Sequence, residues 1–358
     1  MSASPDSTGA AVSPDSGEHW SAPGAWRVAD GLHRIPLPLP MDGLRAVNVY
    51  VLESGDASGG LTLIDGGWAI TESRTALEKG LAQIGRGFGD IRRFLVTHVH
   101  RDHYSLAATL GTEYGVDVTL GIGDKPTLDM LLDPSSVSGP TMFDQLRDAG
   151  AHDLAELFEG FDLDDGRDDR SSRYPDTWLE GDQRIAVGER TLDAIHTPGH
   201  TRGHFVFADT AAGMLFAGDH VLPTITPSIG FEPAVGEQPL RDFMASLTRM
   251  RELPDLRLLP AHGPVAPSTH ARVDELLAHH ERRLSLCLAA LTGGAPVTSK
   301  EVAQTLPWTR HEHPFSRLDS FNAALAVMET KAHLELLVAR GQAARSPSAD
   351  GVGFSPAG

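Results

Sequence analysis

The segment Thr97-His98-Val99-His100-Arg101-Asp102-His103 follows an apolar run and carries three histidines and an aspartate within six residues. Imidazole nitrogens and carboxylate oxygens are the ligands that zinc and similar divalent metals take in proteins. Alternate side chains of an extended chain point the same way, so His98 and His100 can bind one metal ion together. Asp102 and His103 then lie where the chain turns into the next element, and they can face a second ion. This density and spacing predict a metal site rather than an ordinary polar loop.

Further polar residues of this kind follow predicted strands elsewhere in the chain. Apolar strands are predicted to lead into Asp65, into the histidine-rich segment, into Asp219 and into His262, while His200 follows a Pro-Gly turn between two further strands. A rigid sheet presents a functional site in this way, through polar residues at its strand ends and loops. Five separate instances in one chain favour a single site built from distant segments.

Length and composition limit the class of protein. The chain has 358 residues, a hydrophobic fraction of 41% and a formal net charge of −18. No apolar run approaches the ~20 residues of a membrane span, and the start lacks the basic and apolar parts of a secretory signal. Cys287 is the one cysteine, so an internal disulfide framework is excluded. We therefore expect a cytoplasmic protein, and the acidic balance argues against nucleic-acid binding as the main role.

The composition changes along the chain and suggests four parts. Residues 1–23, rich in Ser, Ala, Gly, Pro and Asp, are predicted to be a disordered leader, and residues 346–358 a disordered tail. Residues 24–268 are predicted to form the catalytic domain, within which 122–177 is a helical lid insertion ending in a flexible acidic run. Residues 269–345, with long helical stretches and a nearly neutral charge, are predicted to form a small C-terminal domain.

Four motifs occur in a fixed order over about residues 25–265: His-x-His-x-Asp-His, Pro-Gly-His, Gly-Asp-His and Ala-His-Gly-Pro. In this set and order the sequence resembles the metallo-β-lactamase superfamily. The resemblance implies an α/β fold, the αββα sandwich, with a centre for two divalent metal ions that are expected to be zinc. The C-terminal part, with His280-Glu281-Arg282-Arg283 and Arg340-Gly341, resembles the winged-helix-like extension of the lactamase-like branch of this superfamily.

The resemblance also assigns roles to individual residues. Seven positions match the metal ligands of the family. His98, His100 and His200 match the ligands of the first metal, Asp102, His103 and His262 match those of the second, and Asp219 matches the carboxylate that bridges both. Asp65 matches a residue that orients metal ligands by hydrogen bonding, and His204 is interpreted as a supporting residue. Asp102 is also the candidate catalytic residue, because it is placed to orient the nucleophile. Tyr104 is a candidate substrate contact, although an aromatic residue at a helix start more commonly packs.

Two neighbouring metal ions can lower the pKa of a shared water toward ~7, so that a hydroxide attacks a carbonyl or phosphorus centre. We therefore expect a dinuclear-metal-dependent hydrolase acting on a small ester, thioester or lactone, because an apolar lid suits an acyl group and its acidic run would repel polyphosphate. Ser105-Leu106 replace the Gly-Gly of glyoxalase-II-type sequences, which weakens a glutathione-thioester assignment. The alternative is a phosphodiesterase, ribonuclease or nucleic-acid-binding protein of the same fold. The C-terminal part is expected to support the lid or a homodimer.

Overall fold

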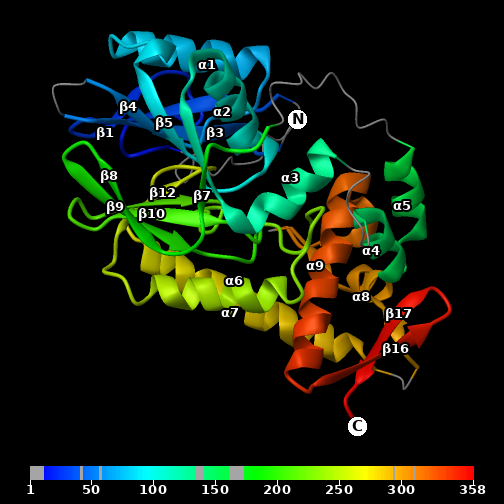
Figure 1. Cartoon of the computed structure of the whole chain (residues 1–358). Helices are drawn as coiled ribbons and strands as arrows, with labels where there is room; N and C mark the ends of the chain where they lie inside the picture. Colours follow the sequence, from blue (N-terminus) through cyan, green and yellow to red (C-terminus); the bar gives the residue numbers. More distant parts are fainter. Residues whose placement is uncertain are drawn as a thin grey trace, which may run out of the picture.

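The computed structural model describes residues 12–40, 43–55, 59–133, 141–160, 173–292, 295–309 and 311–358. Two β-sheets pack face to face, and helices cover the outer face of each sheet (Figure 1). This arrangement confirms the predicted αββα sandwich. Among the described residues, no helix combines the length and the apolar character that crossing a bilayer requires.

The first sheet contains seven strands that lie side by side in sequence order. The first four strands pair antiparallel, and the pairs from β4 to β7 are parallel. Parallel strands end at the same edge of a sheet, so the segments that follow β4 and β5 are neighbours there. The strands are β1 Trp26–Ala29, β2 Leu32–Pro38, β3 Ala46–Glu53, β4 Leu61–Ile64, β5 Ile91–Leu95, β6 Asp117–Gly121 and β7 Thr177–Leu179.

The second sheet has five strands in the order β12-β11-β10-β9-β8. Because β9 and β11 are both antiparallel to β10, and β12 is parallel to β11, these three strands also end at one common edge. The strands are β8 Gln183–Val187, β9 Arg190–His196, β10 Phe205–Asp209, β11 Met214–Gly218 and β12 Arg257–Pro260.

The core is divided into layers by the alternation of side chains along the strands. Phe205 and Phe207 on β10 belong to the apolar layer between the two sheets, whereas Val206 and Ala208 face the helices on the outside. This is the period of two that a strand imposes on its side chains. In the layer between the sheets, the Tyr50 ring of the first sheet meets Phe216 of the second edge-on, with 5.3 Å between ring centroids.

Helices α1 (Thr71–Gln83) and α2 (Arg101–Tyr114) cover the first sheet, and α6 (Pro239–Met250) and α7 (Thr269–Ala290) cover the second (Figure 1). Helix α2 begins within the histidine-rich segment and ends at Gly115, which adopts a left-handed conformation with φ of +66°. A glycine adopts this conformation without the steric cost that a side chain would add.

The predicted insertion contains three described helices, α3 (Lys125–Leu132), α4 (Met142–Asp148) and α5 (His152–Glu159). Helices α4 and α5 bury their apolar side chains in the same core cluster as the C-terminal helices. Lys300 near the start of α8 ties the two parts together, because its backbone N–H donates to the Ala149 carbonyl and its Nζ pairs with Asp153 at 2.6 Å. The predicted acidic run at 161–170 lies outside the described residues.

The C-terminal part continues from α7 with helices and a small antiparallel sheet of order β13-β17-β16, to which β14 and β15 add a separate two-stranded pair. Its other elements are β13 Val297–Thr298, α8 Ser299–Thr305, β14 Pro307–Trp308, β15 His313–Pro314, α9 Ser320–Ala339, β16 Ala343–Ser348 and β17 Gly351–Pro356.

Both predicted disordered ends require correction. The stretch 346–358 contains most of the β16–β17 hairpin, and Phe354 in β17 is only 1% exposed because it packs into the C-terminal core. In the predicted leader, residues 12–23 are also held in place. Asp15 forms a fully buried ion pair with Arg34 of β2 at 2.8 Å, and the Ser13 hydroxyl accepts a hydrogen bond from the Val265 backbone N–H. Residues 1–11 lie outside the described residues.

The Phe354→Ala substitution tests this correction. Removing a buried aromatic ring from a packed core is expected to lower the free energy of unfolding by about 3–5 kcal/mol, measured by denaturant unfolding. Ser355→Ala on the same strand is the matched control. A loss below about 1 kcal/mol, as is usual at an exposed site, would contradict the packing of β17.

Candidate metal centre

The strand ends of both sheets bring every predicted ligand to one site. One ligand atom from each residue of a first group, His98, His100, His200 and Asp219, lies within 4.8 Å of the others. The residues Asp102, His103 and His262 form a second group under the same limit. These side chains follow β5, β9, β11 and β12, which explains how residues far apart in sequence converge.

In the first group, three ring nitrogens point at a common space. His100 Nδ1 lies 2.9 Å from His98 Nε2 and 3.1 Å from His200 Nε2. Ligand atoms around a tetrahedral zinc ion with bonds of ~2.0–2.1 Å are ~3.3 Å apart. The spacing of these nitrogens is therefore close to what a single bound ion of this kind requires.

Hydrogen bonds behind the rings fix which nitrogen faces the centre. His200 Nδ1 lies 2.8 Å from the Ser228 carbonyl and His262 Nδ1 lies 2.8 Å from the Ala46 carbonyl. A carbonyl oxygen only accepts, so each Nδ1 carries the proton and each Nε2 keeps a free lone pair. His103 Nδ1 donates to the Asp65 carboxylate at 2.9 Å in the same way. Such outer partners are typical of metal-ligating histidines.

Several buried atoms have no hydrogen-bond partner among the described residues: His103 Nε2 and His262 Nε2 of the second group, and Asp219 Oδ1 of the first. His262 Nε2 lies 3.4 Å from both Asp102 Oδ2 and Asp219 Oδ1. Leaving buried polar atoms unpaired costs free energy, and a metal ion at their meeting point would satisfy all of them. The donor set therefore fits a divalent cation.

The pKa values of the histidines also favour the binding of a cation. Burial, together with the neighbouring rings, lowers the pKa of His100 to about 3 and keeps that of His98 far below its usual range. These rings are neutral at physiological pH, which is their ligating form. Burial alone would lower the pKa of His103, but Asp102, Asp65 and Asp219 raise it to about 10. The second group is therefore a place that strongly favours positive charge.

Asp65, which follows β4, is hydrogen-bonded to the segment that follows β5. Its carboxylate accepts hydrogen bonds from the Thr97 backbone N–H at 2.8 Å and the Thr97 hydroxyl at 3.0 Å, as well as from His103. Asp65 adopts a left-handed backbone conformation with φ of +62°, which is uncommon for a residue with a side chain. Local strain of this kind is typical of functional sites, where surrounding contacts hold it in place.

His200 is carried by a tight turn between β9 and β10. Gly199 in this turn has φ of +138°, and a Cβ atom there would lie 2.4 Å from the Cα of Phe243 in α6. The Ser246 hydroxyl of the same helix donates to the Pro198 carbonyl at 2.9 Å. Only glycine fits this close approach, so the Pro-Gly pair fixes the position of His200 against α6.

His204 lies behind the first group and is turned away from it. Its Nε2 accepts a hydrogen bond from the Asp219 backbone N–H at 3.2 Å, and its Nδ1 lies 2.9 Å from the Thr197 hydroxyl. Both ring nitrogens are therefore engaged, and His204 holds the backbone of Asp219.

Tyr104 does not face the centre, in contrast to its prediction as a candidate substrate contact. Its ring is only 2% exposed, and its hydroxyl donates to the Arg173 carbonyl at 2.6 Å. Tyr104 lies in the first turn of α2, where it faces the apolar layer under the first sheet. The packing role that is common for an aromatic residue at a helix start applies here.

Asp124 is a residue of the site that sequence reasoning missed. Its Oδ2 accepts from the Val99 backbone N–H at 2.9 Å, and its Oδ1 accepts from the Gly203 backbone N–H at 2.7 Å. The carboxyl group therefore joins the loop of His98 and His100 to the loop of His200. Burial raises its pKa to about 6, and these hydrogen bonds oppose that shift. Its place just after the strand β6 is the signal that could have found it.

Comparisons with known proteins agree with this geometry. Residues 42–262 match the family model of the metallo-beta-lactamase superfamily. The chain is 28% identical over 295 residues to a Beta-lactamase-like protein 2 homolog of Caenorhabditis elegans, covering 79% of each chain. It is 26% identical over 318 residues to the Probable metallo-hydrolase YqjP of Bacillus subtilis (strain 168), covering 86% of this chain and 91% of that one.

A solved structure shows the same architecture. It is a metallo-beta-lactamase family protein from Thermus thermophilus, with a TM-score of 0.72 and 28% identity, and the match covers 92% of this chain and all of that one. The family model spans well over half of the sequence. The chain therefore belongs to the metallo-beta-lactamase superfamily of hydrolytic enzymes.

Proposed function

We propose that this chain is a dinuclear zinc hydrolase that cleaves a small ester, thioester or lactone. The observation that carries the proposal is the position of Asp219 between the two ligand groups. Its Oδ2 lies 3.5 Å from His200 Nε2 of the first group, and its Oδ1 lies 3.4 Å from His262 Nε2 of the second. A carboxylate with one oxygen in each group is arranged to bridge two ions.

The ligand roles follow from these contacts. We assign the first ion to His98, His100 and His200, the second to Asp102, His103 and His262, and Asp219 to both. Imidazole-rich sets completed by carboxylates suit zinc. When bound, two such ions would polarise the substrate carbonyl and activate water as the nucleophile.

Asp102 is the ligand carboxylate best placed to take part in the reaction. Its side chain is 17% exposed, more than the 10% of Asp219, and its Oδ2 faces His103 and His262. Burial opposes its ionisation, but these two histidines lower its pKa well below the usual range. The ionised carboxylate can therefore accept a hydrogen bond from the attacking water and orient it.

Two observations support an acyl substrate. A stretch of 130 residues is 31% identical to the Atrochrysone carboxyl ACP thioesterase AgnL7 of Paecilomyces divaricatus, although it covers only 36% of this chain and 39% of that protein. The loop whose Ser228 carbonyl holds His200 also carries Ile225, which is 40% exposed, and Phe231, which meets the 54% exposed Phe321 edge-on. Exposed apolar side chains beside such a loop suit an acyl chain.

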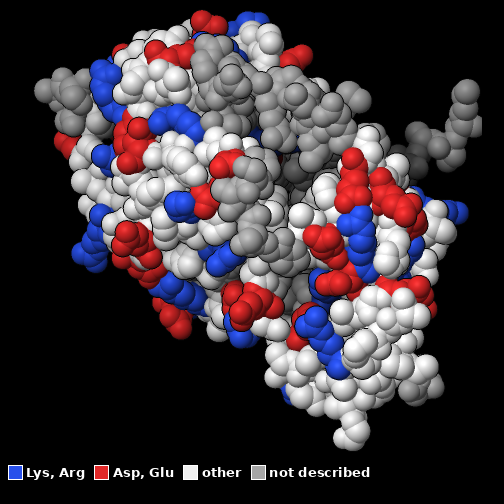
Figure 2. Space-filling view, turned by 45° about the vertical axis from the view of Figure 1, so that its right-hand side comes forward, with Lys and Arg blue, Asp and Glu red and all other residues white. Residues whose placement is uncertain are grey.

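The nucleic-acid alternative has less support. On the face shown in Figure 2, the described Lys and Arg side chains alternate with Asp and Glu rather than forming one continuous basic surface. A nucleic-acid site needs a basic patch to neutralise phosphates. Apart from the β14–β15 pair and a short 3-10 turn between α8 and α9, the element order α7, β13, α8, α9, β16 and β17 supports the proposal that the C-terminal part is winged-helix-like. The hydrogen bonds from Arg272 of α7 to the Leu222 and Ile225 carbonyls support a role in holding the loop beside His200.

A substrate screen tests the function directly. The zinc-loaded protein is assayed on acyl thioesters, lactones, β-lactams, phosphodiesters and single-stranded RNA at low and high salt. We expect turnover of thioesters or lactones that changes little with salt, and its loss after chelation. Preferential RNA cleavage that falls steeply with salt would refute the acyl assignment.

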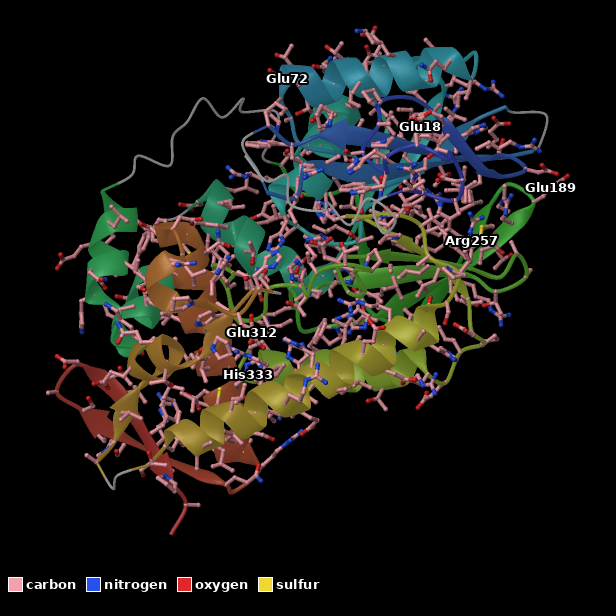
Figure 3. The ribbon with its side chains drawn as sticks, turned by 180° about the vertical axis from the view of Figure 1, so that it is seen from behind. Glu18, Glu72, Glu189, Arg257, Glu312 and His333 are labelled. Atoms are coloured by element: carbon pink, nitrogen blue, oxygen red, sulfur yellow. The ribbon has the colours of Figure 1, made fainter. Side chains whose placement is uncertain are left out.

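Asp102→Asn tests the catalytic assignment. The amide lacks the negative charge that orients the attacking water, so kcat/KM on the best substrate is expected to fall about 10²-fold. Glu72→Gln on α1, labelled in Figure 3, is the control and should keep wild-type kinetics. Metal content is measured in parallel, and an Asp102→Asn enzyme with both ions and full activity would exclude this role.

Asp65→Asn tests the orientation of His103. Removing the negative charge behind the ring is expected to weaken zinc binding about 10–100-fold, measured by competition with a chromogenic chelator. Asp209→Asn, which removes a buried carboxylate paired with Arg190 at 2.8 Å instead, controls for a general loss of stability. Equal zinc affinity in the Asp65→Asn and wild-type proteins would show that this hydrogen bond does not support the site.

A further inference from the structure

A second histidine cluster lies away from the centre, at the contact between α7 and α9. These helices pack side by side, as Figure 3 shows from behind with His333 of α9 labelled. His279 and His280 are adjacent on α7, and Glu329 and His333 are four residues apart on α9. Residues four apart share one face of a helix, so both α9 side chains are directed toward the same neighbour.

The geometry of this cluster resembles that of a metal site. One ligand atom each of His279, His280 and Glu329 lies within 4.8 Å of the other two. His280 and His333 are both buried, and their rings are 5.4 Å apart.

A chain of hydrogen bonds fixes the state of His280. His333 Nδ1 lies 2.7 Å from the Glu329 backbone carbonyl, so this nitrogen carries the proton. His333 Nε2 is then an acceptor, and it lies 3.3 Å from His280 Nδ1, which must donate. His280 Nε2 is left as a bare lone pair. It is buried and has no hydrogen-bond partner among the described residues.

A buried nitrogen with a free lone pair costs free energy unless something binds it. The arrangement repeats the pattern found at the main centre, where a histidine is held from behind through Nδ1 and offers Nε2 to an ion. Here the supporting group is a second histidine, itself anchored on a backbone carbonyl.

The charges around the cluster also fit this role. Burial lowers the pKa of His279 to about 4 and holds that of His280 far below its usual range, so both rings are neutral. Burial raises the pKa of Glu329, and the charge of Arg283 opposes this shift. Its guanidinium is, however, also engaged elsewhere, because it donates to the Pro307 carbonyl at 2.8 Å and lies over the Trp308 ring at 4.2 Å.

We propose that His279, His280 and Glu329 bind a further divalent ion of the zinc type, which joins α7 to α9 and is separate from the ions of the catalytic centre. Two imidazoles and one carboxylate suit zinc, and a water molecule would complete a four-coordinate site. The half-buried His279 leaves a side from which the ion and water can enter.

The site has a structural consequence for the neighbouring loop. Arg272 on α7 donates from Nε to the Leu222 carbonyl at 2.6 Å and from an Nη atom to the Ile225 carbonyl at 2.8 Å. The same loop continues to Ser228, which holds His200. An ion between α7 and α9 would therefore make the base of this loop more rigid.

Metal content of the full-length protein tests the proposal. Wild type, His279→Gln and Glu329→Gln are loaded with Zn²⁺, dialysed and measured by elemental mass spectrometry, with His270→Gln on the same helix as the matched control. We expect each of the two cluster variants to hold about one zinc ion fewer than wild type and the control. This difference does not depend on the catalytic centre, so the result is separate from that of the proposed function.

Thermal unfolding gives a second readout. Zinc should raise the Tm of wild type and of His270→Gln more than that of the two cluster variants, because they lack one binding event. Circular dichroism at low temperature verifies that each variant is folded. Equal zinc content in wild type and a folded cluster variant, together with equal Tm shifts, would overturn the site.

Discussion

Parallel strands end at a common edge, and the metal centre exists because two such edges face each other across the sandwich. Asp65 and the His98 segment leave the first sheet side by side, while the segments of His200, Asp219 and His262 leave the second. The apolar layer between the sheets sets the distance between these two groups of loops. The chemistry therefore depends on the packing of side chains that never touch a substrate.

Electrostatics then limits what can occupy the space between the loops. Asp65, Asp102 and Asp219 surround His103 with negative charge, and burial makes that charge costly to leave uncompensated. The neutral rings of His98 and His100 supply lone pairs rather than charge. A positive ion balances the negative charge of the carboxylates and binds the lone pairs of the neutral rings. This explains why the buried histidines and the buried acids are found together.

The sequence predicted which side chains converge, because the spacing of His98 to His103 reflects local backbone geometry and the motif order added the distant partners. The backbone carbonyls of Ser228 and Ala46, which accept from His200 and His262, could not be predicted. Every residue has such a carbonyl, so the sequence does not mark which one is used. The role of Tyr104 could not be predicted, because an aromatic ring at a helix start can either contact a substrate or pack in the core. The β16–β17 hairpin was missed because its Gly, Ser and Pro content resembles a disordered tail, although Phe354 supplies the buried anchor.

Asn48 on β3 adds a connection between the two halves. Its Nδ2 donates to the Pro260 and Gly263 carbonyls at 3.0 Å each, and its backbone N–H donates to the Ala261 carbonyl at 2.7 Å. These bonds fasten the first sheet to the strand end that carries His262. The ligands are aligned only while the two sheets keep this relative position. The free energy of metal binding is therefore coupled to the packing of the two sheets. A mutation that loosens the sandwich would thus reduce metal affinity without touching any ligand.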